Sequence, residues 1–190
     1  MKEIYFGQSF QATVRRSNMK TFKTFLESTN GYYYIGANPT VDLVVIRGQE
    51  VLLIKRKSGG VEGGKWAIPG GFIETTAKAG QAWVPGKETP KEAALRELWE
   101  ETGLRISSAI KMRFLGIFVG GGRDPRDTKE SWSRSHAFAV TLTPEYRGFS
   151  DADSVVSGKD DASDARWFAI GSIPALAFDH NKIIKKALGK

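Results

Sequence analysis

The sequence of 190 residues contains no cysteine and no long apolar segment. The absence of cysteine excludes disulfide bonds, zinc sites built on thiolates and thiol nucleophiles. The first residues lack the apolar core of a secretory signal peptide, and no segment reaches the roughly 20 apolar residues that a membrane-spanning helix needs. We therefore expect a cytoplasmic protein with no membrane partner.

Acidic residues are fewer than basic ones, with 21 Asp and Glu against 28 Lys and Arg, which gives a net charge of +7. A positive charge favours anionic ligands. A polyphosphate substrate and a nucleic acid fit it equally well, so charge alone does not choose between them. The apolar content of 41% and the length are typical of a single globular domain that buries a core.

The clearest local pattern lies in residues 86–104. Thr89 precedes Pro90, and Glu92 stands at the capping-box position, so we predict that a helix begins here. Gly103 is suited to the left-handed conformation that ends a helix. The side of this helix predicted to pack on a sheet carries Ala94, Leu95, Leu98 and Thr102.

The other side of this helix carries three glutamates, Glu97, Glu100 and Glu101, on one stripe. Like charges at this spacing destabilise a helix by roughly a few tenths of a kcal/mol per pair unless cations neutralise them. Arg96 alone cannot neutralise three carboxylates. Clustered carboxylate oxygens suit Mg²⁺, and also Mn²⁺.

These positions resemble the Nudix box, in which a glutamate is followed after seven residues by Arg-Glu-apolar-X-Glu-Glu-X-Gly-apolar. The box is filled without substitution by Glu88, Arg96, Glu97, Leu98, Glu100, Glu101, Gly103 and Leu104. An ordinary amphipathic helix with a solvated acidic face would not fix so many positions at once. The resemblance implies an α/β protein with the Nudix fold, a mixed β-sheet sandwiched between helices (α/β/α). It also implies a metal-dependent pyrophosphohydrolase.

The resemblance assigns roles to the residues of the box. It implies metal binding by Glu97, Glu100 and Glu101, completed by the backbone carbonyl of Gly71. Glu88 resembles the family residue that contacts metal-bound water, and Arg96 the residue that holds the carboxylates in place. Divalent ions neutralise the charge of a phosphoanhydride and lower the pKa of bound water, which is the chemistry that such a reaction needs.

The general base is left open between several acidic residues. Nudix enzymes often place it on a loop outside the box, which makes Asp160, Asp161 and Asp164 candidates. A box glutamate is the alternative. Aspartates in such a loop are also common turn formers.

The sequence departs from the family in one place. Five residues are expected between Gly71 and the first box glutamate, whereas residues 72–87 make sixteen. We interpret the difference as an eleven-residue insertion, from Thr75 to about Pro85, because loop-closure entropy grows slowly with length. The alternative is loss of the glycine's role, since strict counting from Glu88 arrives at Ala82. We prefer the insertion because both flanking segments match the family well.

A second resemblance concerns the substrate. Residues 124–132, then Asp160-Asp161-Ala162 and Arg166-Trp167, resemble segments of the ADP-ribose pyrophosphatases, closest to the mitochondrial type and the related domain of a cation channel. The similarity runs from about residue 39 to the C-terminus and implies cleavage of ADP-ribose to AMP and ribose 5-phosphate. The residues taken as substrate-binding are Arg123, Asp124, Arg126 and Trp132. Asp124-Pro125 is also a good turn former.

The remaining expectations concern organisation. Residues 1–37 are interpreted as an N-terminal extension that packs on the core or on a dimer partner, and residues 38–190 as the Nudix domain. We predict a hairpin from residues 41–46 and 51–57, strands over 113–119 and 136–142, and a final helix over 179–188. Homodimers are frequent among ADP-ribose enzymes, but the sequence itself shows none.

Three rival functions remain open. The first is hydrolysis of another nucleotide (NADH, a sugar nucleotide or a nucleoside triphosphate), because the box is shared and only the pocket differs. The second is a non-catalytic regulator, against which the complete set of carboxylates argues. The third is an RNA substrate, but no motif of interleaved aromatic and basic residues supports it, so nucleic acid is not expected as a partner.

Overall fold

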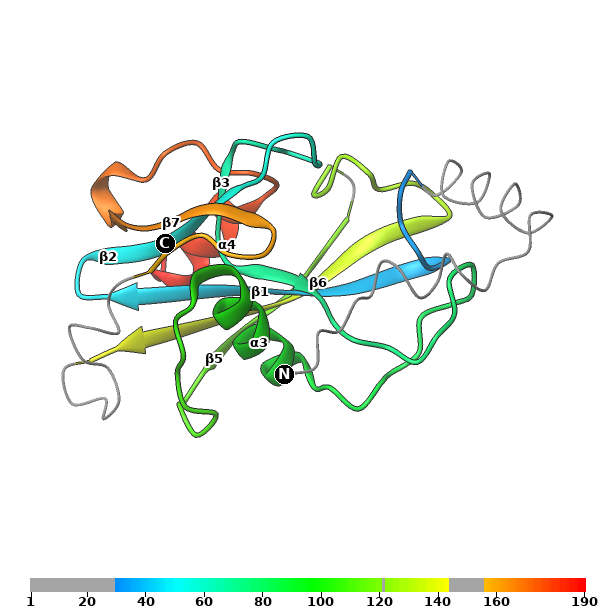
Figure 1. Ribbon diagram of the computed structural model, residues 1–190, viewed down its shortest axis with the longest axis horizontal. Coiled ribbons are helices and arrows are strands. Elements are labelled where there is room, and N and C mark those ends of the chain that lie inside the picture. The colour runs from blue at the N-terminus through cyan, green and yellow to red at the C-terminus, as the bar shows by residue number, and fades with distance from the viewer. Residues whose placement is uncertain (1–29, 121, 144–155) are drawn as a thin grey trace.

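The computed structural model describes residues 30–120, 122–143 and 156–190 (Figure 1). The expectations for the first 29 residues lie outside these ranges. The elements in chain order are β1 (Gly36–Arg47), β2 (Glu50–Arg56), β3 (Trp66–Ala67), β4 (Gly70–Phe72), α3 (Pro90–Thr102), β5 (Arg113–Val119), β6 (Ser131–Leu142), β7 (Ala162–Ala169), the 3₁₀ turn η1 (Ile170–Ser172) and α4 (His180–Ala187).

The described strands form one seven-stranded sheet with the order β3-β2-β1-β6-β5, in which β4 also pairs with β1 and β7 with β2. β1 and β6 run parallel along their whole length, and the other pairs are antiparallel. The predicted hairpin is confirmed by the pairing of Arg47 with Glu50, and Gly48 takes a φ of 56° in its turn. The sheet is therefore mixed, as the resemblance implied.

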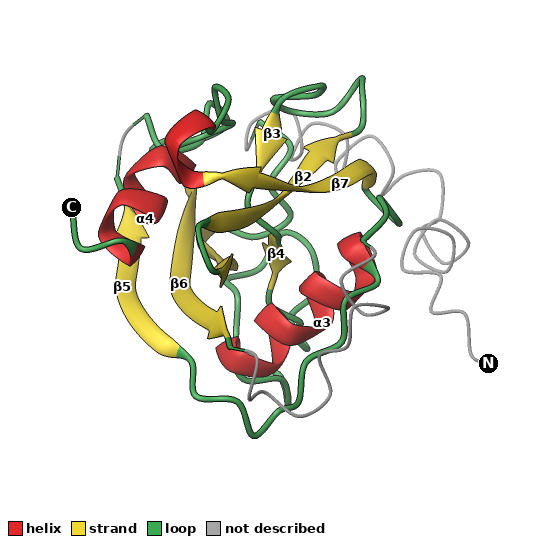
Figure 2. Cartoon of the chain, turned by 90° about the vertical axis from the view of Figure 1, so that its left-hand side faces the viewer, coloured by secondary structure: helices red, strands yellow, loops and turns green. Residues whose placement is uncertain are grey.

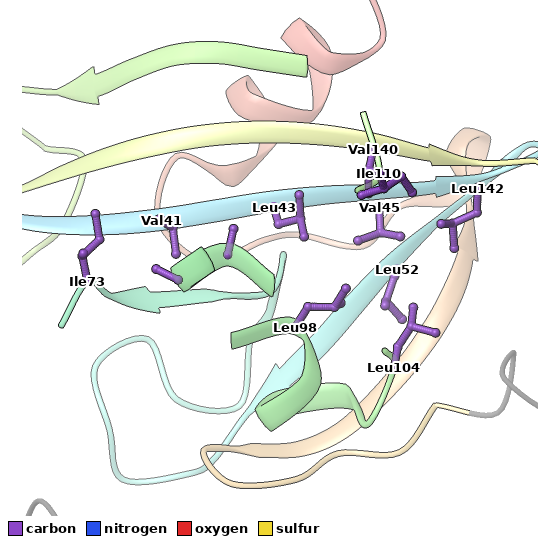
Figure 3. Close-up of a cluster of buried hydrophobic side chains, with 12 residues drawn as sticks. Val41, Leu43, Val45, Leu52, Ile73, Leu98, Leu104, Ile110, Val140 and Leu142 are labelled. Atoms are coloured by element: carbon purple, nitrogen blue, oxygen red, sulfur yellow. The ribbon is translucent and has the colours of Figure 1, made fainter. Parts of the chain in front are cut away.

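Strand β1 sends alternate side chains to opposite faces of the sheet, which is why both faces carry a core. Val41 and Val45 belong to a cluster with Leu98 of α3, whereas Val44 belongs to a cluster with Ile183 of α4. Figure 3 shows the first cluster, and Figure 2 shows α3 and α4 on opposite sides of the sheet. The expected α/β/α arrangement is confirmed.

Helix α3 begins and ends where its sequence predicted. Thr89 accepts a hydrogen bond from the backbone of Glu92 in a complete capping box, and Gly103 ends the helix at a φ of 74°. The buried residues are Ala93, Ala94, Leu98, Glu101 and Thr102. Leu95 is only half-buried, whereas Glu101 of the acidic stripe is buried.

The segment between β4 and α3 is closed at its base by an antiparallel bridge between Thr75 and Pro85. The backbone N–H of Glu74 donates to Glu88 Oε2 at 2.9 Å, so the residues flanking this segment lie side by side. Trp83, within it, packs against the α3 core cluster. This geometry fits an insertion at residues 75–85 that leaves the strand and the helix in place.

Two boundaries differ from the sequence expectations. β6 begins at Ser131, five residues before the expected start, because its first half pairs in parallel with the start of β1. β1 begins at Gly36, so the domain boundary expected at residue 38 falls inside a strand. Strands β3 and β4 are separated by Ile68 and Pro69, and Pro69 has no N–H to donate to a ladder.

Candidate active site

A cleft of about 380 Å³ opens beside α3. Residues from the sheet, from α3 and from the loops before β6 and β7 line it. The expected site residues that line it are Gly71, Arg96, Glu97, Glu100, Glu101, Arg123, Asp124, Arg126, Asp160 and Asp161. These expected residues, up to 90 positions apart in the chain, thus meet in one place.

One guanidinium holds the outer carboxylates of this cleft together. Arg96 Nε donates to Glu88 Oε1 at 2.7 Å, which ties the residue before the helix to the helix itself. Arg96 Nη1 donates to Glu97 Oε1 at 2.9 Å and to Glu100 Oε2 at 2.8 Å. Arg96 Nη2 donates to the carbonyl of Phe72 at 3.0 Å, which fixes α3 against β4. Arg96 thus contacts all three carboxylates, which is the geometry that the implied positioning role would need, and Glu88 reaches the cluster through it without lining the cleft.

Two glutamates of the cleft, the buried Glu101 and the half-buried Glu97, lie largely out of solvent. Burial raises the pKa of Glu97 to about 7, although the Arg96 charge opposes this. Burial also raises the pKa of Glu101 well above its usual range, although Glu101 Oε2 accepts a hydrogen bond from the N–H of Gly70 at 2.9 Å. These carboxylates are therefore an electrostatic cost to the protein unless a further cation joins them.

The chemistry of this set fits a divalent ion. Its donors are hard carboxylate oxygens, and Gly71 presents backbone so near to Glu97 that a β-carbon would overlap the carboxylate. Among the described residues, no three acidic or histidine side chains already converge in a ligating arrangement. Arg96 engages oxygens of Glu97 and Glu100. Glu97, Glu100 and Glu101 are the residues that would hold Mg²⁺ or Mn²⁺, whose chemistry there is to neutralise phosphate charge and to acidify water.

The loop before β7 is tied to the C-terminal end of α3. The N–H of Lys159 donates to the carbonyl of Glu101 at 3.0 Å, and the N–H of Lys57 donates to the carbonyl of Asp161 at 3.1 Å. Asp160 has a φ of 44°, a conformation that residues other than glycine seldom adopt. Both aspartates of this loop line the cleft, so the fold places two candidate bases beside the acidic helix.

Asp164, the third candidate base, lies apart from the cleft lining. Its carboxylate pairs with Arg166 Nη2 at 2.6 Å on β7. This pairing favours the other two aspartates as the base.

Arg123 is buried at the cleft wall, and carboxylates of the protein already pair with its guanidinium. It is 7% exposed, and its guanidinium pairs with Asp42 of β1 and lies 3.4 Å from Asp179 Oδ1. Asp42 also pairs with His180 Nε2 at 3.2 Å, while His180 Nδ1 accepts from the N–H of Ile68 at 3.1 Å. Burial alone would raise the pKa of Asp42, but His180 and Arg123 hold it below its usual range. The network joins β1, α4 and the loop before β6 beneath the cleft.

Arg126 stands at the cleft wall in a fixed orientation. Its Nη2 and Nε atoms bind the carboxylate of Asp124 at 2.7 and 3.0 Å, and its guanidinium lies 4.7 Å from the ring centroid of Tyr32. The ring of Phe72 lies on the same guanidinium at 5.9 Å. This pairing of a planar cation with aromatic rings suits contact with a nucleotide.

The structure does not bring Trp132 to this cleft. Its side chain contributes to a separate shallow pocket with Val119 and Thr128, because it points to the opposite face of β6 from Ser133, which lines the cleft.

Asp42, Arg56, Phe178 and His180 also line the cleft, and none of them belongs to a motif in the sequence. Asp42 had one usable signal, since it is a lone carboxylate within an apolar strand. Phe178 has a φ of 52°, and no pattern in the sequence predicts this backbone conformation.

Comparisons with known proteins agree with this geometry. A NUDIX domain family model matches residues 36–187. The chain is 30% identical over 183 residues to the ADP-ribose pyrophosphatase of Methanocaldococcus jannaschii, covering 95% of this chain and 85% of that protein. It is 27% identical over 144 residues to the NAD-capped RNA hydrolase NudC of Chromobacterium violaceum, covering 76% of this chain and 42% of that protein.

Among solved structures, the NUDIX domain of Shewanella oneidensis NrtR complexed with ADP ribose superposes with a TM-score of 0.62 at 22% identity, over 100% of this chain and 98% of that one. In the described part of the chain, none of the helices has the length and apolar character to cross a bilayer. The family match and the archaeal relative together confirm the resemblance to the ADP-ribose pyrophosphatases. The chain belongs to the NUDIX domain family and is a Nudix hydrolase.

Proposed function

We propose that this Nudix hydrolase cleaves the pyrophosphate of ADP-ribose to AMP and ribose 5-phosphate, with Mg²⁺ or Mn²⁺ as cofactor. The observation that carries the proposal is the meeting of the Glu97–Glu101 stripe with Arg126 and the loop of Asp160 and Asp161 in one cleft. The similarity to the archaeal ADP-ribose pyrophosphatase, over nearly the whole chain, supports the same substrate.

The residues of the cleft take distinct parts in this reaction. Asp161 or Asp160 accepts a proton from the attacking water, whose oxygen forms a bond to one phosphorus while the bond from that phosphorus to the bridging oxygen breaks. The two products are AMP and ribose 5-phosphate, and the water supplies the added oxygen and hydrogens. Arg96 keeps the carboxylates in place. A bound divalent ion would offset the charge of the pyrophosphate.

The nucleoside end of the substrate needs a flat apolar surface. Phe178 offers its ring at the cleft wall, and Phe72 and Arg126 offer a second flat surface. The strained φ of Phe178 is of the kind that persists where function requires it. We propose that adenine packs on one of these surfaces.

A second candidate is the hydrolysis of NAD-capped RNA. The similarity to NudC favours it, and a net charge of +7 suits a polyanionic substrate. This chain spans less than half of that relative, however, and the similarity to the ADP-ribose pyrophosphatase covers far more of both proteins. We therefore rank ADP-ribose first.

A substrate screen tests the proposal. ADP-ribose, NADH, a sugar nucleotide, a nucleoside triphosphate and an NAD-capped RNA are incubated with Mg²⁺ or Mn²⁺, and products are identified by chromatography. We expect the highest kcat/KM with ADP-ribose and the products AMP and ribose 5-phosphate. A higher kcat/KM for any other compound in the panel would remove the substrate assignment and leave the reaction class intact.

A variant tests the reaction class separately. We expect Glu101→Gln to lower kcat by orders of magnitude with the fold retained, because it removes a buried carboxylate of the proposed metal site. Near-normal turnover of Glu101→Gln with Mg²⁺ would remove the metal assignment.

A further inference from the structure

Four arginines line the cleft, and three of them are engaged by carboxylates. Arg96 binds three glutamates, Arg123 pairs with two aspartates, and Arg126 binds Asp124 through two hydrogen bonds. Arg56, at the end of β2, is the fourth. Among the described residues, no carboxylate oxygen lies within 4.0 Å of its guanidinium.

The Arg56 side chain is nevertheless held in a defined orientation. Its Nε donates to the backbone carbonyl of Val61 at 2.9 Å. The Phe178 ring lies 4.9 Å from its guanidinium carbon. With Nε committed to a neutral carbonyl, the two terminal nitrogens remain as donors without a charged partner among the described residues.

The surroundings of Arg56 are those of an anion-binding cation. Burial lowers its pKa, and the charge of Glu101 acts in the opposite direction. Arg126 lines the same cleft, together with the carboxylates of Asp124 and Asp161, so a second guanidinium faces the space that Arg56 faces. Two arginines placed together attract a group with several negative oxygens, such as a pyrophosphate.

The glycine-rich loop after β2 closes directly on Arg56. The N–H of Arg56 donates to the carbonyl of Lys65, and the N–H of Gly64 donates to the carbonyl of Arg56, both at 3.0 Å. Val61, which holds Nε, lies at the far side of this loop. The loop thus forms hydrogen bonds with both the backbone and the side chain of Arg56.

Two glycines of this loop differ sharply in the room around them. A β-carbon on Gly63 would lie 2.8 Å from the carbonyl oxygen of Lys57 and 3.0 Å from that of Gly60. A β-carbon on Gly60 would meet nothing closer than 3.9 Å. Neither glycine has a positive φ, so an alanine at either position causes no backbone strain. Its effect depends only on the room for the added methyl group.

We propose that Arg56 binds the phosphate oxygens of the substrate and that Val61 and Gly63, in the glycine-rich loop after β2, orient its side chain. Arg56 touches the substrate, whereas Gly63 is a positioning residue that acts through the Val61 carbonyl. The inference rests on the proposed function for the identity of the substrate, but the anion site itself needs only a pyrophosphate. The loop therefore works through one arginine side chain, without cradling phosphate in its own backbone.

Five variants test this assignment: Arg56→Gln, Arg56→Lys, Gly63→Ala, Gly60→Ala and Lys57→Gln. Two quantities are measured with Mg²⁺ present: kcat and KM for ADP-ribose, and the Kd of inorganic pyrophosphate by calorimetry. We expect Arg56→Gln to weaken pyrophosphate binding and raise KM by about 10- to 100-fold, as loss of a charge-assisted hydrogen bond does. Gly63→Ala is expected to shift both quantities in the same direction.

The remaining variants are controls for charge and for loop rigidity. Gly60→Ala and Lys57→Gln are expected to stay within about 2-fold of the original protein, because neither position lines the cleft. Arg56→Lys keeps the charge but loses the bond to Val61, so it is expected to fall between the original protein and Arg56→Gln. Thermal melting of each variant shows whether the fold is retained, and Arg56→Lys decides the orienting role if Gly63→Ala melts early.

Two results would overturn the assignment. Pyrophosphate binding that is unchanged in Arg56→Gln would remove Arg56 from the anion site, even if ADP-ribose is the substrate. Equal behaviour of Gly63→Ala and Gly60→Ala in a folded protein would remove the orienting role of the loop. Pyrophosphate binding that depends on Arg56, in an enzyme that prefers a different nucleotide, would uphold the anion site and contradict only the proposed substrate.

Discussion

Gly71 and Glu97 lie in direct contact: a β-carbon built on Gly71 would stand 2.5 Å from the carboxyl carbon of Glu97. A strand residue without a side chain is therefore what allows the carboxylate of α3 to rest against the backbone of β4. The contact joins the segment before the insertion to the helix after it. It makes the geometry of the acidic cluster depend on a single missing methyl group.

The first prediction is that Gly71→Ala lowers kcat by about 10-fold or more, because a displacement of roughly 1 Å in a catalytic group costs rate on this scale. The fold should be retained, because the atoms that must move belong to the end of a flexible side chain. Steady-state kinetics with Mg²⁺ and a thermal melt measure the two effects. Gly171→Ala is the matched control, since its β-carbon would meet nothing within 4 Å. Equal kinetics for the two variants would show that the contact is not required.

The second prediction concerns the stability of the metal-free protein. The pKa of Glu97 is raised to about 7 by burial, so the folded protein binds a proton there more tightly than the unfolded chain does. Stability from this group is therefore present at low pH and is lost as the pH rises from about 4.5 to 7, with a slope of at most about 1.4 kcal/mol per pH unit. Urea unfolding in EDTA across this range measures the slope.

Glu97→Gln supplies the control for that measurement. It is expected to reduce the pH dependence by the contribution of Glu97, because the amide does not titrate, and to leave the contribution of Glu101 in place. Mg²⁺ is expected to raise the stability of the original protein near pH 7 by binding the folded state. An unchanged slope in Glu97→Gln would assign the pH dependence to other groups.

The third prediction separates the candidate bases. Asp161→Asn or Asp160→Asn is expected to lower kcat by about 100-fold or more with a small change in KM, since general-base catalysis contributes on this scale. Asp164→Asn should leave kcat nearly unchanged, because Asp164 pairs with Arg166 and does not line the cleft. A large loss of kcat in Asp164→Asn alone would contradict this assignment and point to β7.

The fourth prediction concerns the insertion. Replacing residues 76–84 with a two-residue turn between Thr75 and Pro85 should leave hydrolysis within about 10-fold, because these two residues already pair as neighbours. The melting temperature should fall, because Trp83 is removed from the α3 core cluster. Complete loss of hydrolysis in a folded variant would show that the insertion supplies part of the active site.

The elements predicted correctly from the sequence are those whose signals are local. The capping box of α3, the glycine at its end and the hairpin turn at Gly48 each depend on residues within a few positions of one another. The acidic stripe follows from helical periodicity, which needs no tertiary contact. The resemblance to the Nudix box, carried by residues 88–104, implied the family, the reaction class and the metal-binding candidates, and the family match confirmed the first two.

The tertiary structure alone decided which charges are available to a ligand. Arg123 has its partner Asp42 81 residues away in the chain, and the pairing engages the Arg123 guanidinium at the cleft wall. Arg56 carries no motif, and it stands out only because the other cleft arginines are engaged. Whether a charged side chain is available to a ligand depends on which residues the packing of distant strands and loops places beside it. Local sequence patterns do not contain this information.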